Sequence, residues 1–239
     1  MQNEAFIGNE FRMNRYWDED TLMKMKQYIP SNRNIIEIGA HCGTSTIVYS
    51  SFLTPENQIF AYEPQYGMYL LLAHNIEQNN LQNKIKPFHQ GVFCYKGPGT
   101  MNSTDLDGGG GNVLRRYTQE SHIHCNFGGI GLGKEGESVT LTTLDDMEHS
   151  NIGFIHCDAQ GSENFIFSGG KNLIKTNRPV ILYENNEKYC KLLYNNVCAT
   201  YPSYIEESKF NVAEYCMNEL KYTTCYERFN GSIDTLLIP

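Results

Sequence analysis

The chain has 239 residues, and its 27 Asp and Glu residues outnumber its 19 Lys and Arg residues, which gives a formal net charge of −8. This length suits one domain with a substantial core, and the acidic balance argues against a nucleic-acid partner, because phosphate binding needs a basic face. No apolar stretch approaches the roughly 20 residues of a membrane span, the N-terminus lacks a signal-peptide pattern, and the eight cysteines are scattered, so we expect a cytoplasmic protein with reduced thiols.

Residues 1–33 are expected to form a helical segment ahead of the first strand. Apolar residues recur at helical spacing from Leu22 to Ile29, after an acidic helix start, and Pro30 ends this helix. The apolar run 34–38 then indicates a buried strand. We expect the whole of 1–239 to be a single domain.

The segment after this strand carries the most informative motif of the chain. Glu37 is followed by the glycine loop 39–43, and Thr44 then opens a potential helix. A strand that leads into a glycine loop and a helix N-terminus is typical of nucleotide-like ligands in doubly wound folds. A pyrophosphate site would use a third glycine and no acid, whereas the carboxylate of Glu37 suits the ammonium group of S-adenosylmethionine. The predicted cofactor residues of this loop are Glu37, Gly39, Ala40, His41, Gly43, Thr44 and Ser45.

A second acid follows the next expected strand, 58–62. Glu63 lies roughly 20 residues beyond the glycine loop, where such folds place the acid that binds ribose hydroxyls. Pro64 has no N–H and ends the strand. Two acids at adjacent strand ends, one for an ammonium group and one for a ribose, predict a pocket for S-adenosylmethionine.

A helix over 65–80 and a short strand over 84–88 are expected next, and Gly91 and Val92 after that strand are further predicted cofactor contacts. Residues 97–136 are rich in glycine and follow no period. Long loops of this kind inside compact domains are usually functional. We expect a hairpin and a loop that forms part of the wall for the methyl acceptor, and a surface insertion without function is the alternative.

One group in this insertion could bind a metal. His122, His124 and Cys125 are potential ligands, but no second ligand pair follows at a matching spacing. We therefore assign no metal site to them.

The rest of the chain alternates strands and helices and ends in two strands. The expected elements are a strand over 138–142, a strand over 152–158, a helix from 163 to about 169, a strand over 179–184, a cap segment over 186–210, a helix over 211–220 and strands over 223–228 and 233–238. Asn230-Gly231 is a strong signal for a hairpin turn between the last two. The predicted fold class is α/β, a Rossmann-like class I methyltransferase with a mostly parallel seven-stranded sheet and a C-terminal antiparallel hairpin.

Three residues are candidates for catalysis. Asp158 ends strand 152–158, which in a doubly wound sheet lies beside the first strand and so under the transferred methyl group. Its carboxylate could act as a base toward a hydroxyl, or bind Mg²⁺ or Mn²⁺ that acidifies the hydroxyl. His156 points to the same side of the strand, and Glu184 ends the next one. Packing is the alternative role for His156.

Five motifs, taken in order, resemble the FkbM family of S-adenosylmethionine-dependent methyltransferases. They are the glycine loop at 37–43, Glu63-Pro64, Thr143-Leu144-Asp145-Asp146, the segment 156–163 and the segment from Arg178-Pro179 to Glu184. The family usually has Asn at the position of His41, Lys at that of His156 and Glu at that of Gln160. The resemblance covers roughly 34–184 and implies methyl transfer to a hydroxyl oxygen, often on a sugar or a natural product.

The leading interpretation is an O-methyltransferase that uses S-adenosylmethionine and acts on a sugar or glycoconjugate. Alternatives are a methyltransferase for another small molecule or an RNA cap, a NAD-type Rossmann oxidoreductase, and a non-catalytic Rossmann-like module. The acidic charge counts against the RNA cap, and Glu37 together with the missing third glycine counts against the oxidoreductase. The metal requirement and the oligomeric state stay open.

Overall fold

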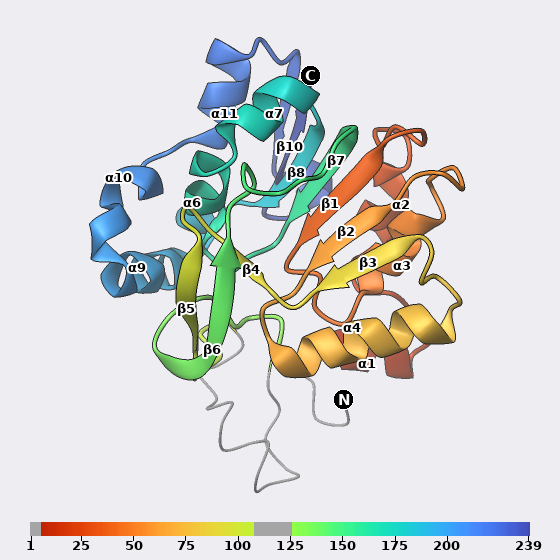
Figure 1. Ribbon diagram of the computed structural model, residues 1–239, viewed down its shortest axis with the longest axis horizontal. Helices are drawn as coiled ribbons and strands as arrows, with labels where there is room; N and C mark the ends of the chain where they lie inside the picture. The colour runs from red at the N-terminus through yellow and green to blue at the C-terminus, as the bar shows by residue number, and fades with distance from the viewer. Residues whose placement is uncertain (1–5, 108–125) are drawn as a thin grey trace, which may run out of the picture.

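The computed structural model describes residues 6–107 and 126–239 as a central sheet covered by helices, with a smaller sheet beside it (Figure 1). Within these residues the central sheet has seven strands, in the order β3-β2-β1-β7-β8-β10-β9. Their bounds are β1 Asn34–Ile38, β2 Ile59–Tyr62, β3 Ile85–Phe88, β7 Ile152–Cys157, β8 Val180–Glu184, β9 Thr224–Glu227 and β10 Asp234–Ile238. The glycines at 108–111 and the group His122, His124 and Cys125 lie outside the described residues.

The strand directions confirm the predicted fold class. The strands β1, β2, β3, β7 and β8 pair in parallel, and β10 runs antiparallel to both β8 and β9. The chain leaves β1 toward β2 and β3, and later returns to the other side of β1 as β7. The boundary between β1 and β7 is therefore the topological switch point, where doubly wound sheets bind their ligands.

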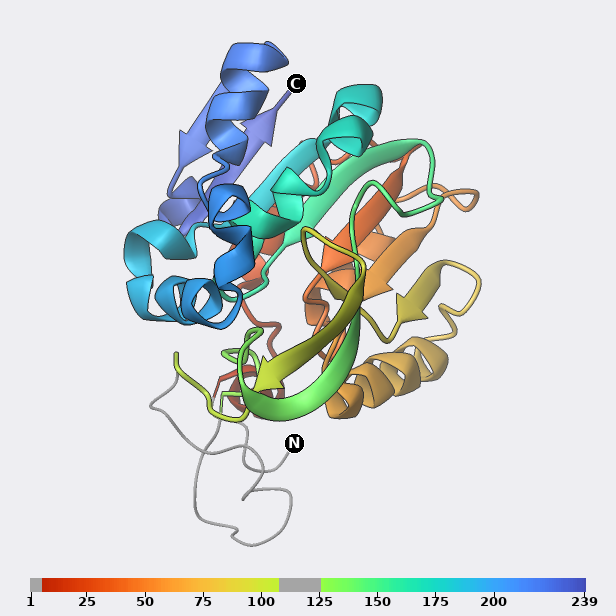
Figure 2. The same cartoon turned by 60° about the vertical axis from the view of Figure 1, so that its left-hand side comes forward.

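Strand alternation divides the apolar residues of the sheet between two helical layers (Figure 2). On one face Ile36, Ile155 and Ile181 pack against α6, α7, α11 and the π-helical turn η2. On the other face Ile35 and Phe154 pack against α2, α3 and α4. The bounds of these elements are α2 Glu19–Met25, α3 Thr44–Ser50, α4 Tyr66–Gln78, α6 Glu163–Ser168, α7 Lys171–Asn177, α11 Val212–Glu214 and η2 Tyr215–Glu219.

The smaller sheet pairs the start of the insertion with the strand that follows the insertion, which differs from the hairpin expected within 97–136. In the part of the chain that the structure describes, it has three strands in the order β4-β6-β5, with β5 antiparallel to β6. Phe93, Leu141 and Phe165 form its core. The bounds are β4 Gly91–Val92, β5 Gly97–Asn102 and β6 Glu135–Thr142.

Residues 186–210 pack beside this smaller sheet. Val197 belongs to its core, and the hydroxyl of Tyr201 exchanges hydrogen bonds of 3.2 and 3.1 Å with the backbone N–H and carbonyl of Thr100. The elements of this segment are α8 Asn186–Tyr189, α9 Lys191–Thr200, η1 Pro202–Tyr204 and α10 Ile205–Ser208. Its aromatic residues thus stabilise the hairpin.

The last connection is longer than the predicted two-residue turn. The dipeptide Asn230-Gly231 does form a tight turn, with φ of 54° and 80° and a hydrogen bond of 3.1 Å from the N–H of Ser232 to the carbonyl of Phe229. However, the turn lies in η3 (Phe229–Gly231), outside both strands. The amide of Asn230 donates to the hydroxyl of Thr21 at 2.9 Å, so the turn is anchored to α2.

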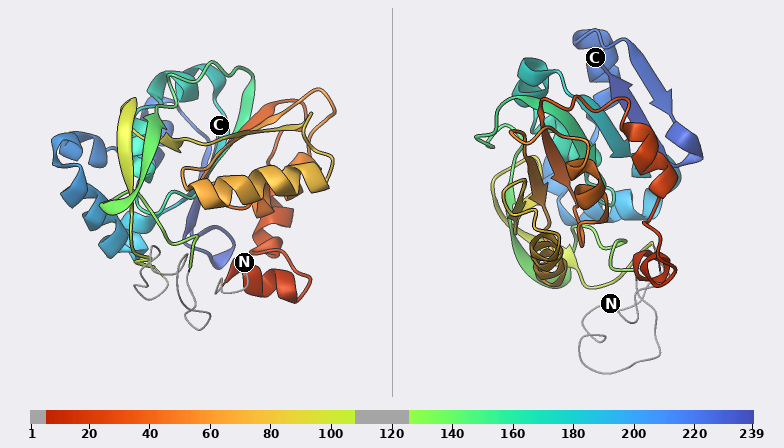
Figure 3. Two further views of the ribbon diagram at one scale, coloured as in Figure 1. Left: turned by 60° about the horizontal axis from the view of Figure 1, so that its bottom comes forward. Right: turned by 90° about the vertical axis from the view of Figure 1, so that its right-hand side faces the viewer.

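Two further features complete the fold. The first helix, α1 (Ile7–Arg12), lies at the foot of the view in Figure 1, and the right-hand view of Figure 3 shows it apart from α4. Among the helices that the structure describes, none has the length and apolar character needed to cross a membrane. The seven cysteines of the described residues are all free thiols.

Candidate active site

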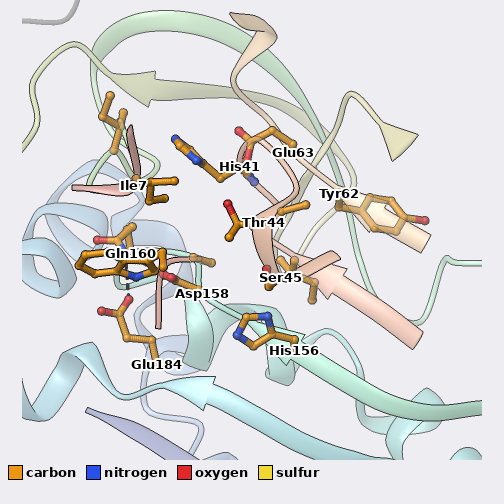
Figure 4. Close-up of a pocket in the computed structure, with 18 of the residues that line it drawn as sticks. Ile7, His41, Thr44, Ser45, Tyr62, Glu63, His156, Asp158, Gln160 and Glu184 are labelled. Carbon is orange, nitrogen blue, oxygen red and sulfur yellow. Dashed lines mark hydrogen bonds between the residues drawn. The ribbon is translucent and has the colours of Figure 1, made fainter. Parts of the chain in front are cut away.

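A cavity of about 580 Å³ lies at the carboxyl ends of the parallel strands, at the switch point (Figure 4). Its walls come from the glycine loop after β1, the ends of β2, β7 and β8, and the start of β10. Two further walls come from the N-terminal segment and from the insertion between β5 and β6. Ligands of open α/β sheets bind at this position.

The glycine loop is fixed between β2 and β7. The N–H groups of Gly39 and Ala40 both donate to the carbonyl of Tyr62, at 3.0 and 3.1 Å. Gly39 has φ of 80°, and a Cβ atom there would lie 1.8 Å from the carbonyl oxygen of Asp158. Only glycine fits so close to the neighbouring strand end. Gly43, with φ of 90°, packs closely against the side chain of Leu72 and does not line the cavity.

Glu63 is anchored by the backbone. Its two carboxylate oxygens accept hydrogen bonds of 2.7 Å from the N–H groups of His41 and Gln65. The side chain is 2% exposed and lines the cavity. Burial raises the pKa of Glu63 to about 8, despite these two hydrogen bonds. A ligand that donates further hydrogen bonds would stabilise the ionised form.

His41 points an unpaired ring at the cavity. The residue is 8% exposed, and neither ring nitrogen has a hydrogen-bond partner among the described residues. Burial lowers the pKa of His41 to about 4, so the ring is neutral and offers one donor and one acceptor. Buried polar atoms without partners usually mark a place where a ligand or water binds.

Glu37 does not line the cavity. Its side chain is fully buried, the hydroxyl of Ser45 donates to one carboxylate oxygen, and Nδ1 of His156 lies 3.2 Å from the same oxygen. The register pairs Glu37 with His156 on adjacent strands, so both side chains lie on the face covered by α3. The carboxylate therefore reaches the cavity only through Ser45 and His156, which differs from the direct contact expected from the sequence.

The surroundings of His156 favour its protonated form. Burial alone would lower the pKa of His156, but the hydrogen bond and charge of Glu37, with the charges of Asp158 and Asp234, outweigh burial and raise it. An imidazolium has no free lone pair to accept a proton. The raised pKa thus favours a cation at this point of the cavity wall, and the catalytic role of His156 stays a prediction.

Asp158 and Glu184 are joined by Gln160. The amide nitrogen of Gln160 donates to Asp158 at 2.7 Å and to Glu184 at 3.0 Å, as the dashed lines in Figure 4 show. Asn186 adds a hydrogen bond of 2.5 Å to Glu184. Burial and the charges of Asp158 and Glu163 raise the pKa of Glu184, whereas the exposed Asp158 faces the cavity.

The sequence reasoning missed four acids of the cavity wall, which are Glu10, Asp18, Asp107 and Asp234. Asp18 precedes α2, and Asp234 begins β10, where it lies opposite Glu184. Because β10 is antiparallel, its first residue lies at the edge where the parallel strands end. That relation could have been read from the predicted hairpin. Asp18 was noted only as part of a helix start.

Apolar and aromatic residues cover the cavity. Phe6 and Trp17 of the N-terminal segment line it with their rings in an edge-to-face contact of 5.8 Å between centroids. Met101, Ile130 and Leu132 of the insertion line it from the other side. No residue of 186–210 lines the cavity, so the described cover comes from the N-terminal segment and the insertion.

The structure thus brings most of the predicted residues together. The cavity is lined by the catalytic candidates Asp158, Glu184 and His156, and by the predicted cofactor residues Gly39, Ala40, His41, Thr44, Ser45, Glu63, Pro64, Gly91 and Val92. The described residues contain no group of three or more His, Cys, Asp or Glu side chains arranged to hold a metal ion.

The chain is similar to several solved methyltransferase structures. A putative caffeoyl-CoA O-methyltransferase from Staphylococcus aureus is 15% identical with a TM-score of 0.51, over 97% of this chain and 90% of that one. An FkbM methyltransferase from Methylobacillus flagellatus KT is 15% identical with a TM-score of 0.46, over 72% of this chain but only 38% of that one. The O-methyltransferase TomG from Streptomyces achromogenes, solved with S-adenosylmethionine, is 13% identical with a TM-score of 0.39, over 69% and 53% of the two chains.

Sequence comparison identifies the family. No curated protein matches the chain. The profile of the methyltransferase FkbM domain, by contrast, matches residues 37–215, a span that runs from the glycine loop to the helical turn after α11. The match covers well over half of the sequence and includes all five motifs named above, and the chain therefore belongs to the FkbM family of methyltransferases.

Proposed function

We propose that the protein transfers the methyl group of S-adenosylmethionine to a hydroxyl group of a sugar or glycoconjugate. The observation that carries this proposal is a single cavity in which Glu63, the loop at Gly39 and the carboxylate of Asp158 meet at neighbouring strand ends. Residues 1–239 act as one domain in this proposal. The N-terminal segment and the insertion form the walls on the acceptor side.

The cofactor side of the cavity fits S-adenosylmethionine. Glu63 is a buried acceptor that matches a ribose diol, and the glycine loop at Gly39 lines the cavity. The unpaired ring of His41 offers a further contact to this ligand. Gly91 and Val92, which form β4 of the smaller sheet, also line the cavity. Bound S-adenosylmethionine supplies a methyl group already activated on a sulfonium.

The chain's own residues then align the hydroxyl and remove its proton. Asp158 is the exposed carboxylate at the switch point and accepts the hydroxyl proton as the oxygen attacks the methyl group. Gln160 holds Asp158 beside Glu184 by donating a hydrogen bond to each. The carboxylate of Glu37 accepts a hydrogen bond from Ser45 and contacts His156, and these contacts orient both side chains. A metal bound by Asp158 is the alternative to the base.

The acceptor side favours a polyhydroxylated molecule. Phe6 and Trp17 present aromatic rings at the mouth, next to carboxylates that accept hydrogen bonds. Aromatic rings and carboxylates together match the apolar faces and the hydroxyl groups of sugars. The methyltransferase family removes the oxidoreductase from consideration.

Calorimetric titration tests the cofactor assignment. We expect S-adenosylmethionine and S-adenosylhomocysteine to bind one site per chain, and NAD to show no binding. Binding of NAD in preference to both would reject the proposed function.

A further inference from the structure

The cavity is strongly acidic. Among the described residues that line it, two are histidines and none is a lysine or an arginine. The lining carboxylates are Glu10, Asp18, Glu63, Asp107, Asp158, Glu184 and Asp234. S-adenosylmethionine brings only one net positive charge, so the cofactor alone does not balance this wall.

Some of these acids have partners. Glu10 forms a salt bridge of 2.8 Å with Arg15, Glu63 accepts from two backbone N–H groups, and Asp107 accepts from the amide of Asn126 at 3.2 Å. These three need no cation from a ligand. The other lining carboxylates lie on the opposite side of the cavity, near β8 and β10, and their negative charge calls for a cation.

Four carboxylates gather there. Asp234 lies directly opposite Glu184 in register, where Cβ atoms are about 5 Å apart, and Gln160 joins Glu184 to Asp158. The described salt bridges include none of these four carboxylates. Asp234 accepts a hydrogen bond of 2.8 Å from the hydroxyl of Ser232, and His156 is close enough for its charge to act on Asp18 and Asp234, but neither contact is a salt bridge. Burial, together with neighbouring carboxylates, raises the pKa of Glu184 and of Asp234. Such a cluster is costly unless a cation binds to it.

The side chain of Gln160, in the same wall, also has an acceptor without a hydrogen-bond donor in the described part of the chain. Gln160 lines the cavity and is 7% exposed, and its side-chain oxygen is buried without a hydrogen-bond partner among the described residues. An amide oxygen can only accept hydrogen bonds. The wall formed by Asp158, Gln160, Glu184 and Asp234 therefore presents acceptors that call for a donor-rich, cationic ligand.

We infer that the methyl acceptor carries a protonated amine beside the hydroxyl that is methylated, as an amino sugar or aminocyclitol does. This inference rests on the proposed function and adds the charge of the acceptor to it. The ammonium group binds between Asp18, Glu184 and Asp234, while the hydroxyl faces Asp158. Phosphorylated acceptors, such as nucleotide sugars and coenzyme A esters, are repelled by the same carboxylates.

The charge also selects the atom that is methylated. A protonated amine has no lone pair and cannot attack the methyl group. Carboxylates around the amine favour its protonated form. The amine therefore orients the acceptor, and the neighbouring hydroxyl oxygen attacks the methyl group as Asp158 takes its proton.

The test measures binding of three related hexoses to the protein saturated with S-adenosylhomocysteine. Glucosamine and glucose 6-phosphate each differ from glucose at one position. Glucosamine carries one positive charge, glucose is neutral, and glucose 6-phosphate is negatively charged. By saturation-transfer NMR we expect glucosamine to bind about tenfold more tightly than glucose, and the phosphate to bind more weakly than either. The preference for glucosamine should weaken in high salt.

The variant Asp234→Asn should abolish the preference for glucosamine without changing the affinity for S-adenosylhomocysteine. Asp146→Asn, at an exposed site away from the cavity, is the matched control and should keep the preference. Equal binding of the three hexoses, tighter binding of the neutral or phosphorylated one, or binding of none would overturn the inference while the cofactor result stands. Failure of S-adenosylhomocysteine to bind would instead reject the proposed function.

Discussion

Glu63 is the residue whose role follows most directly from its contacts. Two backbone N–H groups fix its carboxylate at the cavity wall, and its position after β2 matches a ribose ligand. We expect Glu63→Ala to weaken S-adenosylhomocysteine binding by about 1.5–3 kcal/mol, since hydrogen bonds to a charged group are lost. Calorimetry measures the change. Glu56→Ala, an exposed residue before the same strand, is the control, and equal affinity in both variants would move the cofactor elsewhere.

Asp158 can be tested as a base with its shape preserved. Asp158→Asn should lower methyl transfer by about 10²-fold or more while S-adenosylhomocysteine still binds. The matched control is the exposed Asp146→Asn. Steady-state rates on a verified acceptor give the comparison, and near-normal turnover in Asp158→Asn would rule out both of its proposed roles. A chelator distinguishes them, because activity lost and then restored by Mg²⁺ or Mn²⁺ would assign Asp158 to a metal.

Single residues show where sequence reasoning succeeded and where it stopped. The backbone position of Gly39 and the placement of Asp158 could be predicted, because strand ends and glycine loops are local features. The direction of the Glu37 side chain could not, because it depends on His156, a partner on a strand far along the chain. Asp234 was missed because its place at the cavity follows from an antiparallel pairing.

At the scale of elements, the cover of the cavity is the part most open to test. The ends of the insertion line the acceptor side through Met101, Ile130 and Leu132. We expect shortening of the glycine run at 108–111 to weaken acceptor use and leave S-adenosylhomocysteine binding intact. Rates at varied acceptor concentration, with calorimetry of the same variant, measure both. Unchanged turnover would make the insertion a surface loop only.

Helices and strands with local sequence signals were predicted, and elements that depend on contacts with distant residues were not. The strands β1 and β7 and the terminal strands followed from apolar runs and turn residues. The placement of 186–210 beside the smaller sheet did not, because its tyrosines pack against residues distant in sequence, such as Thr100. The helix α7 was also missed, since Gly169 and Gly170 looked like the end of regular structure.

At the scale of the whole molecule, buried acids make stability depend on pH. Burial raises the pKa of Glu63 and of Glu163 to about 8 from an ordinary value of 4.5. Between these values the folded protein holds protons that the unfolded chain has released, so stability falls as pH rises through this window and levels off above it. The ligand-free protein should therefore melt at a lower temperature near pH 8 than near pH 5.

Thermal unfolding across this range checks the sign. Each kcal/mol lost lowers the melting temperature by about 2–4 °C for a chain of this size. Glu63→Gln has no proton to release and should show a shallower slope. A melting temperature that rises steadily from pH 5 to pH 8 would contradict the buried, protonated state of these acids.

The central claim is that this cavity moves a methyl group from S-adenosylmethionine to oxygen. The most direct measurement supplies S-adenosylmethionine with a ¹³C-labelled methyl group, together with amino sugars and aminocyclitols, and records the ¹³C spectrum of the product. We predict one new signal in the region of methyl ethers, with equimolar S-adenosylhomocysteine, and its loss in Asp158→Asn. A labelled methyl group on nitrogen or carbon, or label that stays on the cofactor with every acceptor, would contradict the account.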